Sequence, residues 1–375
     1  MGNDRAGEKK RQNKERIARH ILRRKMISKP ELASELGISM PTVLLNVKEL
    51  TEAGIVEEVG EYESTGGRKA KALSIAGRVK FAVGIDITVN HISLVLIDLK
   101  GEIISQKRIR KCYENLPEYY AAVAEELAFF ISDSGVEKEK ILGVGVSLPG
   151  IIDKEQGRLV QSHILNVKNI NLEVLGRLIP YPIHYENDAN SAAVAELWGE
   201  NRNAVYLSLS NTVGGSVYFN HGIYKGDNFR SAEFGHMILV PEGRTCYCGK
   251  KGCADAYCSA KVLSACVGEE GTLAEFFALL DKQEERAVRA FEQYLDSLAI
   301  LITNLRMAFD CRIIVGGYVG GYLKKYMTEL ERKVLGYNRF DNDTLYLQGC
   351  EYDREASAVG IAMTFVEEYF GSVVL

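Results

Sequence analysis

The order of strand-like and helical runs constrains the fold of this chain most strongly. Residues 81–110 alternate like three strands, with turns at Val89-Asn90 and at Lys100-Gly101. Residues 203–223 repeat the pattern as a second hairpin run. Helical and strand-like segments alternate after each run, including helical stretches at about 117–134 and 284–309. The repeat predicts two related α/β lobes with a cleft between them.

The first 77 residues follow another pattern, which predicts three helices and two strands. The first helix spans roughly residues 10–25, and Ser28 with Glu31 fits a capping box at the start of the second. Ser39 caps the third helix, in which Val43, Val47 and Leu50 form the buried face. The strand-like runs "IVEEV" and "KALSI" then flank a glycine-containing turn. This order predicts a helix-turn-helix followed by a wing, and a small helical packing module is the alternative.

A helix-turn-helix places its second helix in the major groove of DNA, and a wing contacts phosphates or the minor groove. Leu44 and Leu45 are unusual on such a helix, and Leu45 either meets a thymine methyl group or packs against the wing. The residues expected to face DNA are Ser39, Met40, Thr42, Leu45, Asn46, Lys48, Gly67, Arg68 and Lys69.

Charge is distributed unevenly along the chain. Residues 1–76 hold 15 Lys+Arg against 11 Asp+Glu, whereas the remainder holds 31 against 39. A basic segment joined to an acidic body indicates an anionic partner, although a solvated charged helix explains the same numbers. No stretch approaches the ~20 apolar residues of a membrane helix, and the polar N-terminus lacks a signal peptide's apolar core. We therefore expect a cytoplasmic protein, whose eight cysteines are metal ligands or buried thiols rather than disulfides.

Six motifs together resemble one family over essentially the whole chain. They are "VGIDIT" at 83–88, "GVGVSLPGIID" at 143–153, "ENDAN" at 186–190, "AEFGHM" at 232–237, the cysteine cluster at 246–253 and "IVGGYVG" at 314–320. With them the sequence is similar to the ROK family of repressors, uncharacterised reading frames and sugar kinases, in its winged-helix transcription-factor branch.

The resemblance implies an α/β fold and a division into domains. Residues 1–77 would form the winged helix-turn-helix domain, and 78–375 a sugar-kinase-like domain with two lobes of the actin-like ATPase fold. Lobe 1 would span about 78–190 with the C-terminal helix at 355–375. Lobe 2 would span about 191–354 and carry a zinc loop. The resemblance also implies a sugar as ligand and closure of the cleft as the response.

The segment "CYCGKKGC" matches a pattern that binds zinc in this family, together with a preceding histidine. The matching residues are His236, Cys246, Cys248 and Cys253. Three thiolates and one imidazole make a closed tetrahedral Zn²⁺ site, so its role would be structural. A redox pair would need Cys-x-x-Cys spacing, and unliganded buried thiols are the remaining alternative. Cys258 lies past the pattern and is expected to be a core thiol.

Family sugar contacts map onto Asn187, Asp188, Glu233, His236 and Asp255, the last of which replaces the usual Glu. Carboxylates and an amide suit adjacent sugar hydroxyls, and such a site rejects analogues that lack one. If one nitrogen of His236 holds the metal, the other is expected to face the sugar. Asp188 occupies the position of the general base in the kinases, whereas an isolated "ENDAN" would also fit a helix cap.

The glycines that phosphate binding needs are largely missing. "ITVNH" follows Asp86, "SNTVGGS" at 210–216 keeps two glycines, and Tyr318 replaces a third glycine after Gly317. The sequence therefore predicts that sugar recognition survives without ATP binding, so that Asp188 accepts hydroxyl hydrogen bonds and the chain is no enzyme.

The preferred hypothesis is a sugar-responsive DNA-binding regulator, a repressor that a monosaccharide or sugar derivative in the inter-lobe cleft releases from operator DNA. A homodimer is expected, since helix-turn-helix proteins read palindromes, and a tetramer stays open. The alternatives are an ATP-dependent sugar kinase with a DNA-binding domain and a constitutive DNA-binding scaffold. The sequence leaves the sugar itself open.

Overall fold

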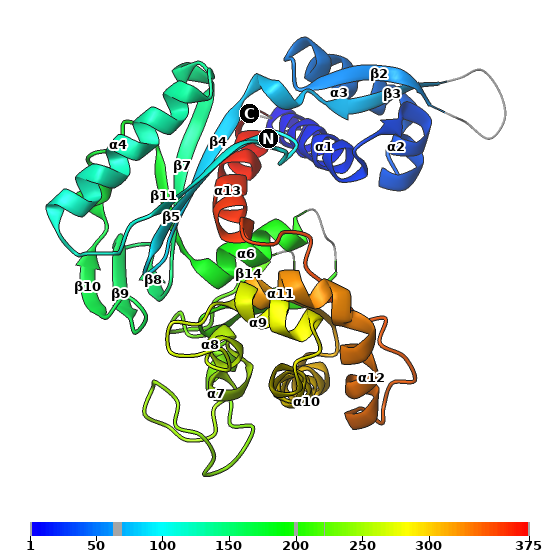
Figure 1. Cartoon of the computed structure of the whole chain (residues 1–375). Helices are drawn as coiled ribbons and strands as arrows, with labels where there is room; N and C mark the ends of the chain where they lie inside the picture. The colour runs from blue at the N-terminus through cyan, green and yellow to red at the C-terminus, as the bar shows by residue number, and fades with distance from the viewer. Residues whose placement is uncertain (1, 63–69, 199–201, 221, 374–375) are drawn as a thin grey trace. The chain divides into compact units, whose positions relative to one another are not determined.

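The computed structural model describes residues 2–62, 70–198, 202–220 and 222–373 (Figure 1). Contacts within the chain divide it into two compact units. The first comprises Met1–Ser147, Leu172–Tyr185 and Ile361–Leu375, and the second comprises Leu148–Asn171 and Glu186–Gly360. This division differs from the lobe boundary expected near residue 190, because residues 148–171 group with the second unit.

The N-terminal part of the first unit contains three helices and a three-stranded antiparallel sheet. The capping box is present, since Ser28 Oγ accepts from Glu31 N and Glu31 Oε2 accepts from Ser28 N at 3.0 Å. The sheet has the strand order β1-β3-β2. The elements are α1 (Gly2–Arg24), β1 (Ile27–Ser28), α2 (Lys29–Leu36), α3 (Met40–Glu52), β2 (Val56–Tyr62) and β3 (Ala70–Ile75).

Helix α3 buries the face that its sequence period predicts. Val43, Val47 and Leu50 are each at most 2% exposed. The expectation that Asn46 faces outward is wrong, because this side chain is only 1% exposed. Position 46 lies three residues after Val43 and four before Leu50, so it shares their side of the helix. Its Nδ2 donates to Thr42 O at 2.7 Å instead.

A five-stranded sheet forms the centre of the rest of the first unit. The order is β11-β7-β4-β5-β6, in which β4, β5 and β6 are the antiparallel run expected from the sequence and β7 is parallel to β4. Helix α4 and the C-terminal part of α13 lie on opposite faces (Figure 1). The elements are η1 (Gly77–Val79), β4 (Phe81–Ile87), β5 (His91–Asp98), β6 (Ile103–Arg110), α4 (Pro117–Asp133), η2 (Lys138–Lys140), β7 (Ile141–Leu148), α5 (Glu173–Gly176), β11 (Ile183–Asn187) and α13 (Ala356–Val373).

The second unit contains another five-stranded sheet, with the order β14-β13-β12-β15-β16. Strands β12, β13 and β14 are antiparallel, as the second hairpin run predicts, and β15 is parallel to β12. A small separate sheet has the order β10-β9-β8. The strands are β8 (Ile151–Asp153), β9 (Arg158–Ser162), β10 (Val167–Asn171), β12 (Ala204–Leu209), β13 (Val213–Phe219), β14 (Gly222–Tyr224), β15 (Arg312–Gly316) and β16 (Leu347–Gly349).

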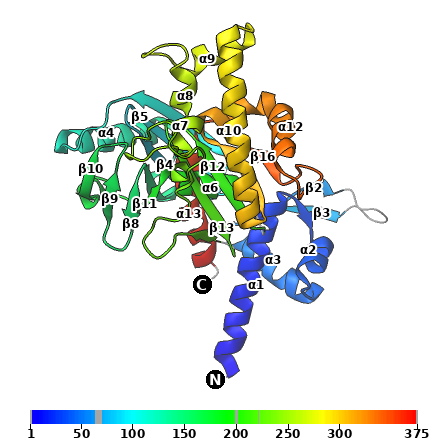
Figure 2. The ribbon, with the colours of Figure 1, turned by 90° about the horizontal axis from the view of Figure 1, so that it is seen from below.

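Helix α10 is the long helix of the second unit and supplies much of its core (Figure 2). Cys258 is fully buried beside it, as expected of a core thiol, and Tyr294 Oη donates to Cys258 O at 2.7 Å. The helices are α6 (Asp188–Leu197), η3 (Phe234–His236), α7 (Asp255–Cys258), α8 (Ala260–Ser264), α9 (Leu273–Asp281), α10 (Glu285–Phe309), α11 (Gly317–Leu323), η4 (Lys324–Tyr326) and α12 (Met327–Tyr337). Over the described residues, none of the helices is long and apolar enough to cross a membrane.

Candidate functional site

A cavity of about 560 Å³ opens in the second unit. This volume lies within the ~300–1,000 Å³ of small-molecule sites. All of its lining residues belong to the second unit. Its polar wall consists of Gln161, Ser162, His163, Glu186, Asn187, Asp188, Asn190, Ser208, Ser210, Thr212, Lys225, Arg230, Ser231, Glu233, His236, Tyr247 and Lys250.

Asn187 lies in the cavity wall and is also the N-cap of α6. Its Oδ1 accepts from Ala189 N at 2.9 Å and Asn190 N at 3.1 Å, and its Nδ2 donates to Gly150 O at 3.0 Å. Asn187 is therefore a helix cap, as the alternative interpretation proposed, and it also lies in the cavity wall. The Asn187 side chain also hydrogen-bonds the carboxylate of Asp188, which opposes the rise in the pKa of that group.

Two of the expected carboxylates come together in the wall. Asp188 is the first residue of α6, and Glu233 precedes η3. Burial raises the pKa of Asp188. Burial also raises the pKa of Glu233, and the charge of Asp188 adds to the rise. The Glu233 side chain is nevertheless 52% exposed, and both carboxylates can accept hydrogen bonds from hydroxyl groups.

Glu186 lines the same wall and was not among the predicted residues, although it begins the "ENDAN" motif. Its Oε1 accepts from Asn187 N at 2.9 Å, and Oε2 forms an ion pair with Lys154. These bonds hold the junction between β11 and α6, so Glu186 positions Asn187.

Asp255 differs from the expectation that it contacts a sugar. The described cavity wall does not include it. The side chain is 6% exposed, and its Oδ2 accepts from Val213 N at 2.7 Å. Asp255 therefore holds the start of β13, and its short side chain is committed to the backbone.

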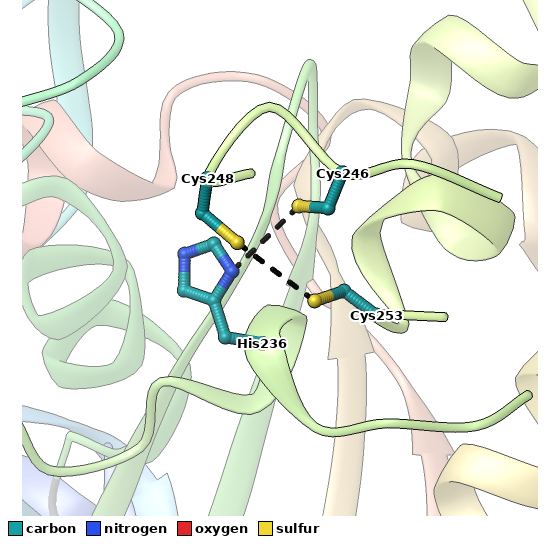
Figure 3. A group of neighbouring side chains, drawn as sticks. All are labelled: His236, Cys246, Cys248 and Cys253. Atoms are coloured by element: carbon teal, nitrogen blue, oxygen red, sulfur yellow. Dashed lines mark hydrogen bonds between the residues drawn. The ribbon is translucent and has the colours of Figure 1, made fainter. Parts of the chain in front are cut away.

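The four residues expected to bind a metal form one cluster (Figure 3). Their ligand atoms all lie within 4.8 Å of one another, so they could hold a metal ion. Cys246 Sγ lies 3.8 Å from His236 Nδ1, and Cys248 Sγ lies 3.8 Å from Cys253 Sγ. Gly249 and Gly252 have φ of 88° and 82°, the left-handed conformation that lets the loop turn between the cysteines.

Tyr247 is a cavity residue that the sequence did not single out. Its hydroxyl lies 3.2 Å from His236 Nε2, and its ring makes an edge contact with that imidazole. Its place between Cys246 and Cys248 could have indicated this role. When two cysteines point toward the same site, the side chain between them must point away from it. Tyr247 thus connects the cluster to the cavity.

Cations also line the cavity and were missed from the sequence. Lys250 Nζ donates to His236 O at 3.1 Å, which ties the cysteine loop to η3. Burial lowers the pKa of Lys225, and the nearby Lys154 lowers it further. Arg230 also lines the cavity, and its charge acts on Glu233. No local motif marks these residues, because they lie in irregular segments.

One segment that would hold a nucleotide in a kinase already has hydrogen-bond partners within the protein. At the N-terminus of α11, Gly317 N donates to Tyr206 Oη at 3.1 Å and Tyr318 N donates to Ser210 Oγ at 3.4 Å. These donors are therefore occupied by side chains of the protein.

Among the described residues, those expected to face DNA lie on α3 or immediately before it. Ser39, Met40, Leu45 and Lys48 are exposed, and Thr42 is half-buried with its hydroxyl 2.8 Å from that of Ser39. Gly67, Arg68 and Lys69 lie outside the described residues.

Residues 82–367 match the model of the ROK family. The chain belongs to the ROK family, which confirms the resemblance found in the sequence.

Named relatives and solved structures are consistent with this membership. The chain is 27% identical to the xylose repressor of Bacillus spizizenii over 382 aligned residues, which cover 97% of each chain. The crystal structure of a ROK family transcriptional regulator, a homolog of the Escherichia coli MLC protein, shares its fold with a TM-score of 0.74 and 19% identity over 97% of this chain and 98% of that one. A ROK family glucokinase from Streptomyces griseus, solved with glucose and AMPPNP, has a TM-score of 0.60 and 19% identity over 76% of this chain and 98% of its own.

Proposed function

We propose that this protein is a sugar-responsive DNA-binding transcriptional repressor. The observation that carries the proposal is the gathering of Asn187, Asp188, Glu233 and His236 in one cavity. These four of the five expected sugar contacts come from segments up to 50 residues apart in sequence. The full-length similarity to a xylose repressor supports the same function.

The sugar is bound by its hydroxyl groups. Asp188 and Glu233 accept hydrogen bonds from them, and Asn187 holds the Asp188 carboxylate in place. His236 Nε2 faces Tyr247 Oη and lies 4.0 Å from Glu233 Oε2, so both partners define the imidazole edge that meets the ligand. Asp255 is left out of this set because Val213 N occupies its carboxylate.

The metal is Zn²⁺ with a structural role. Tetrahedral Zn²⁺ with bonds of about 2.3 Å separates two sulfurs by about 3.8 Å. The separation of Cys248 and Cys253 Sγ is 3.8 Å, and the fourth donor is an imidazole. His236, Cys246, Cys248 and Cys253 would fill all four positions and fix the loop that presents Tyr247.

The N-terminal elements are a winged helix-turn-helix that binds operator DNA. The order of α1, β1, α2, α3, β2 and β3 is that of the motif, and α3 is the recognition helix. Ser39, Met40, Thr42, Leu45 and Lys48 remain the proposed contacts on the helix, and Gly67, Arg68 and Lys69 those of the wing. A homodimer, or a tetramer built from two dimers, would present paired helices to two half-sites.

The competing function is an ATP-dependent sugar kinase. Against it stand the side chains that already bond the N–H groups of Gly317 and Tyr318, together with the lost glycines after Asp86. A coupled assay for ADP release over hexoses and pentoses distinguishes the two. Turnover above ~1 s⁻¹, the low end for enzymes, would establish the kinase.

DNA binding and its response to sugar are tested with the full chain. Duplexes that bind the protein are selected from a random library, and their affinity is measured by fluorescence anisotropy with and without xylose, glucose, N-acetylglucosamine and their phosphates. One sugar is expected to weaken binding, and a complete switch needs about 5.5 kcal/mol of preference for one state. DNA affinity that no sugar alters would favour the constitutive scaffold.

A further inference from the structure

The exposed side of helix α3 is apolar. Met40 is 38% exposed, Leu44 47% and Leu45 50%. Met40 and Leu44 lie one turn apart and flank the buried face that contains Val43, whereas Leu45 lies on the far side, since the helix turns 100° per residue. Single exposed apolar residues are common on proteins, but three in the first half of one helix favour a binding surface.

The same side of α3 offers few groups that could read bases by hydrogen bonds. The hydroxyls of Ser39 and Thr42 lie 2.8 Å apart, and either can donate to the other. Asn46, the single side-chain amide between Met40 and Glu52, is buried. Lys48 is exposed, and Glu52 lies 3.7 Å from its ammonium group. Over Met40–Glu52, all of which is described, no arginine or glutamine occurs.

The major groove presents one apolar group, the C5-methyl of thymine. Arginine and lysine read guanine, and asparagine and glutamine read adenine, through paired hydrogen bonds. A recognition helix whose exposed side carries methionine and leucines is therefore complementary to thymine methyls and poorly suited to purine edges.

We propose that Leu44, Leu45 and Met40 select the operator by contact with thymine methyl groups in the major groove. This inference rests on the proposed DNA-binding function and assigns its specificity to apolar contacts. Lys48 contacts phosphate and contributes affinity without sequence preference. The proposal gives Leu44 a role in base recognition, which the sequence pattern alone did not assign to it.

The test replaces thymine by deoxyuridine, which removes the methyl group and keeps base pairing. Duplexes selected by the full-length protein are resynthesised with deoxyuridine at each thymine position in turn. Every methyl group that is contacted should lower the affinity about fourfold when it is removed, as expected for one buried carbon. Leu44→Ala and Leu45→Ala should reduce this ratio toward one at the positions they contact. Both side chains are exposed, so the variants should fold.

Lys48→Ala is the matched control on the same helix. It should weaken binding to thymine and deoxyuridine duplexes by the same factor and make binding less dependent on salt. Tight binding that is unaffected by deoxyuridine at every position would overturn this inference and leave the proposed function standing. Failure to bind any duplex would overturn both, and the apolar face would then belong to a protein partner.

Discussion

Nδ1 of His236 lies 3.8 Å from Sγ of Cys246, so the imidazole directs one nitrogen into the cysteine cluster and keeps the other for the cavity. The second nitrogen, Nε2, has the hydroxyl of Tyr247 at 3.2 Å. A metal-bound histidine is oriented by the partner of its second nitrogen. A metal in the cluster would therefore fix both the fold of the loop and one wall of the candidate sugar site.

Removal of the metal should unfold the loop and weaken sugar binding together. We expect one Zn²⁺ per chain by elemental analysis, and strong chelators or Cys248→Ser should remove it. The melting temperature should fall, because a structural metal contributes directly to folding free energy.

Cys112→Ser is the control, since this exposed thiol lies outside the cluster. It should keep both the metal and the melting temperature. A purified chain that holds no metal, yet melts at the same temperature with and without added Zn²⁺, would contradict the structural role.

Asp188→Asn should weaken sugar binding by roughly 10- to 100-fold, the usual cost of losing a hydrogen bond to a charged group. Without ligand the variant should be at least as stable as the parent, because a neutral amide avoids the cost of burying a charged carboxylate. Calorimetry with the sugar that weakens DNA binding measures the first effect, and thermal unfolding measures the second.

Asp255→Ala should give the opposite result. The Asp255 carboxylate accepts from Val213 N and the described cavity wall does not include it, so removal of this acceptor should lower stability and change sugar affinity little. Equal losses of sugar affinity in both variants would restore Asp255 as a sugar contact.

Sugar affinity should rise with pH. Burial raises the pKa of Asp188, so the carboxylate that accepts hydroxyl bonds is lost at a higher pH than in water. The charge of Asp188 also raises the pKa of Glu233, so both carboxylates change in the same direction. Stability without ligand should change in the other direction, because a raised folded-state pKa contributes stability at low pH and loses it as pH rises. Calorimetry from neutral pH down to the acid limit of the folded protein measures the first trend, and an affinity that does not fall at the acid end would contradict Asp188 as an ionised acceptor.

Asn46→Leu should stabilise the N-terminal helices and leave DNA affinity unchanged. Among the described residues, Asn46 Oδ1 has no hydrogen-bond partner, and an unsatisfied buried group costs about 1–3 kcal/mol. Native-state hydrogen exchange of the α3 amides should slow accordingly. A large loss of operator affinity would instead mean that Asn46 contacts DNA.

Several features of this protein could be predicted because their signals are local. The capping box at Ser28 and the buried period of Val43, Val47 and Leu50 depend on residues within two turns of helix. The His/Cys cluster spans 18 residues, and Gly249 and Gly252 both have a positive φ between its cysteines. The antiparallel runs at 81–110 and 203–223 follow from alternation and short turns.

What the sequence alone determined is therefore the set of elements, the metal-binding pattern and the motifs of the family. Only the tertiary structure decided which polar side chains are available. Asp255 is committed to Val213 N, Asn46 is buried, and Tyr247, Lys225 and Arg230 join the cavity from irregular loops. The physical reason is that hydrogen-bond partners distant in sequence and the packing of loops fix the exposure of a polar group, whereas periodicity and caps act over a few neighbouring residues.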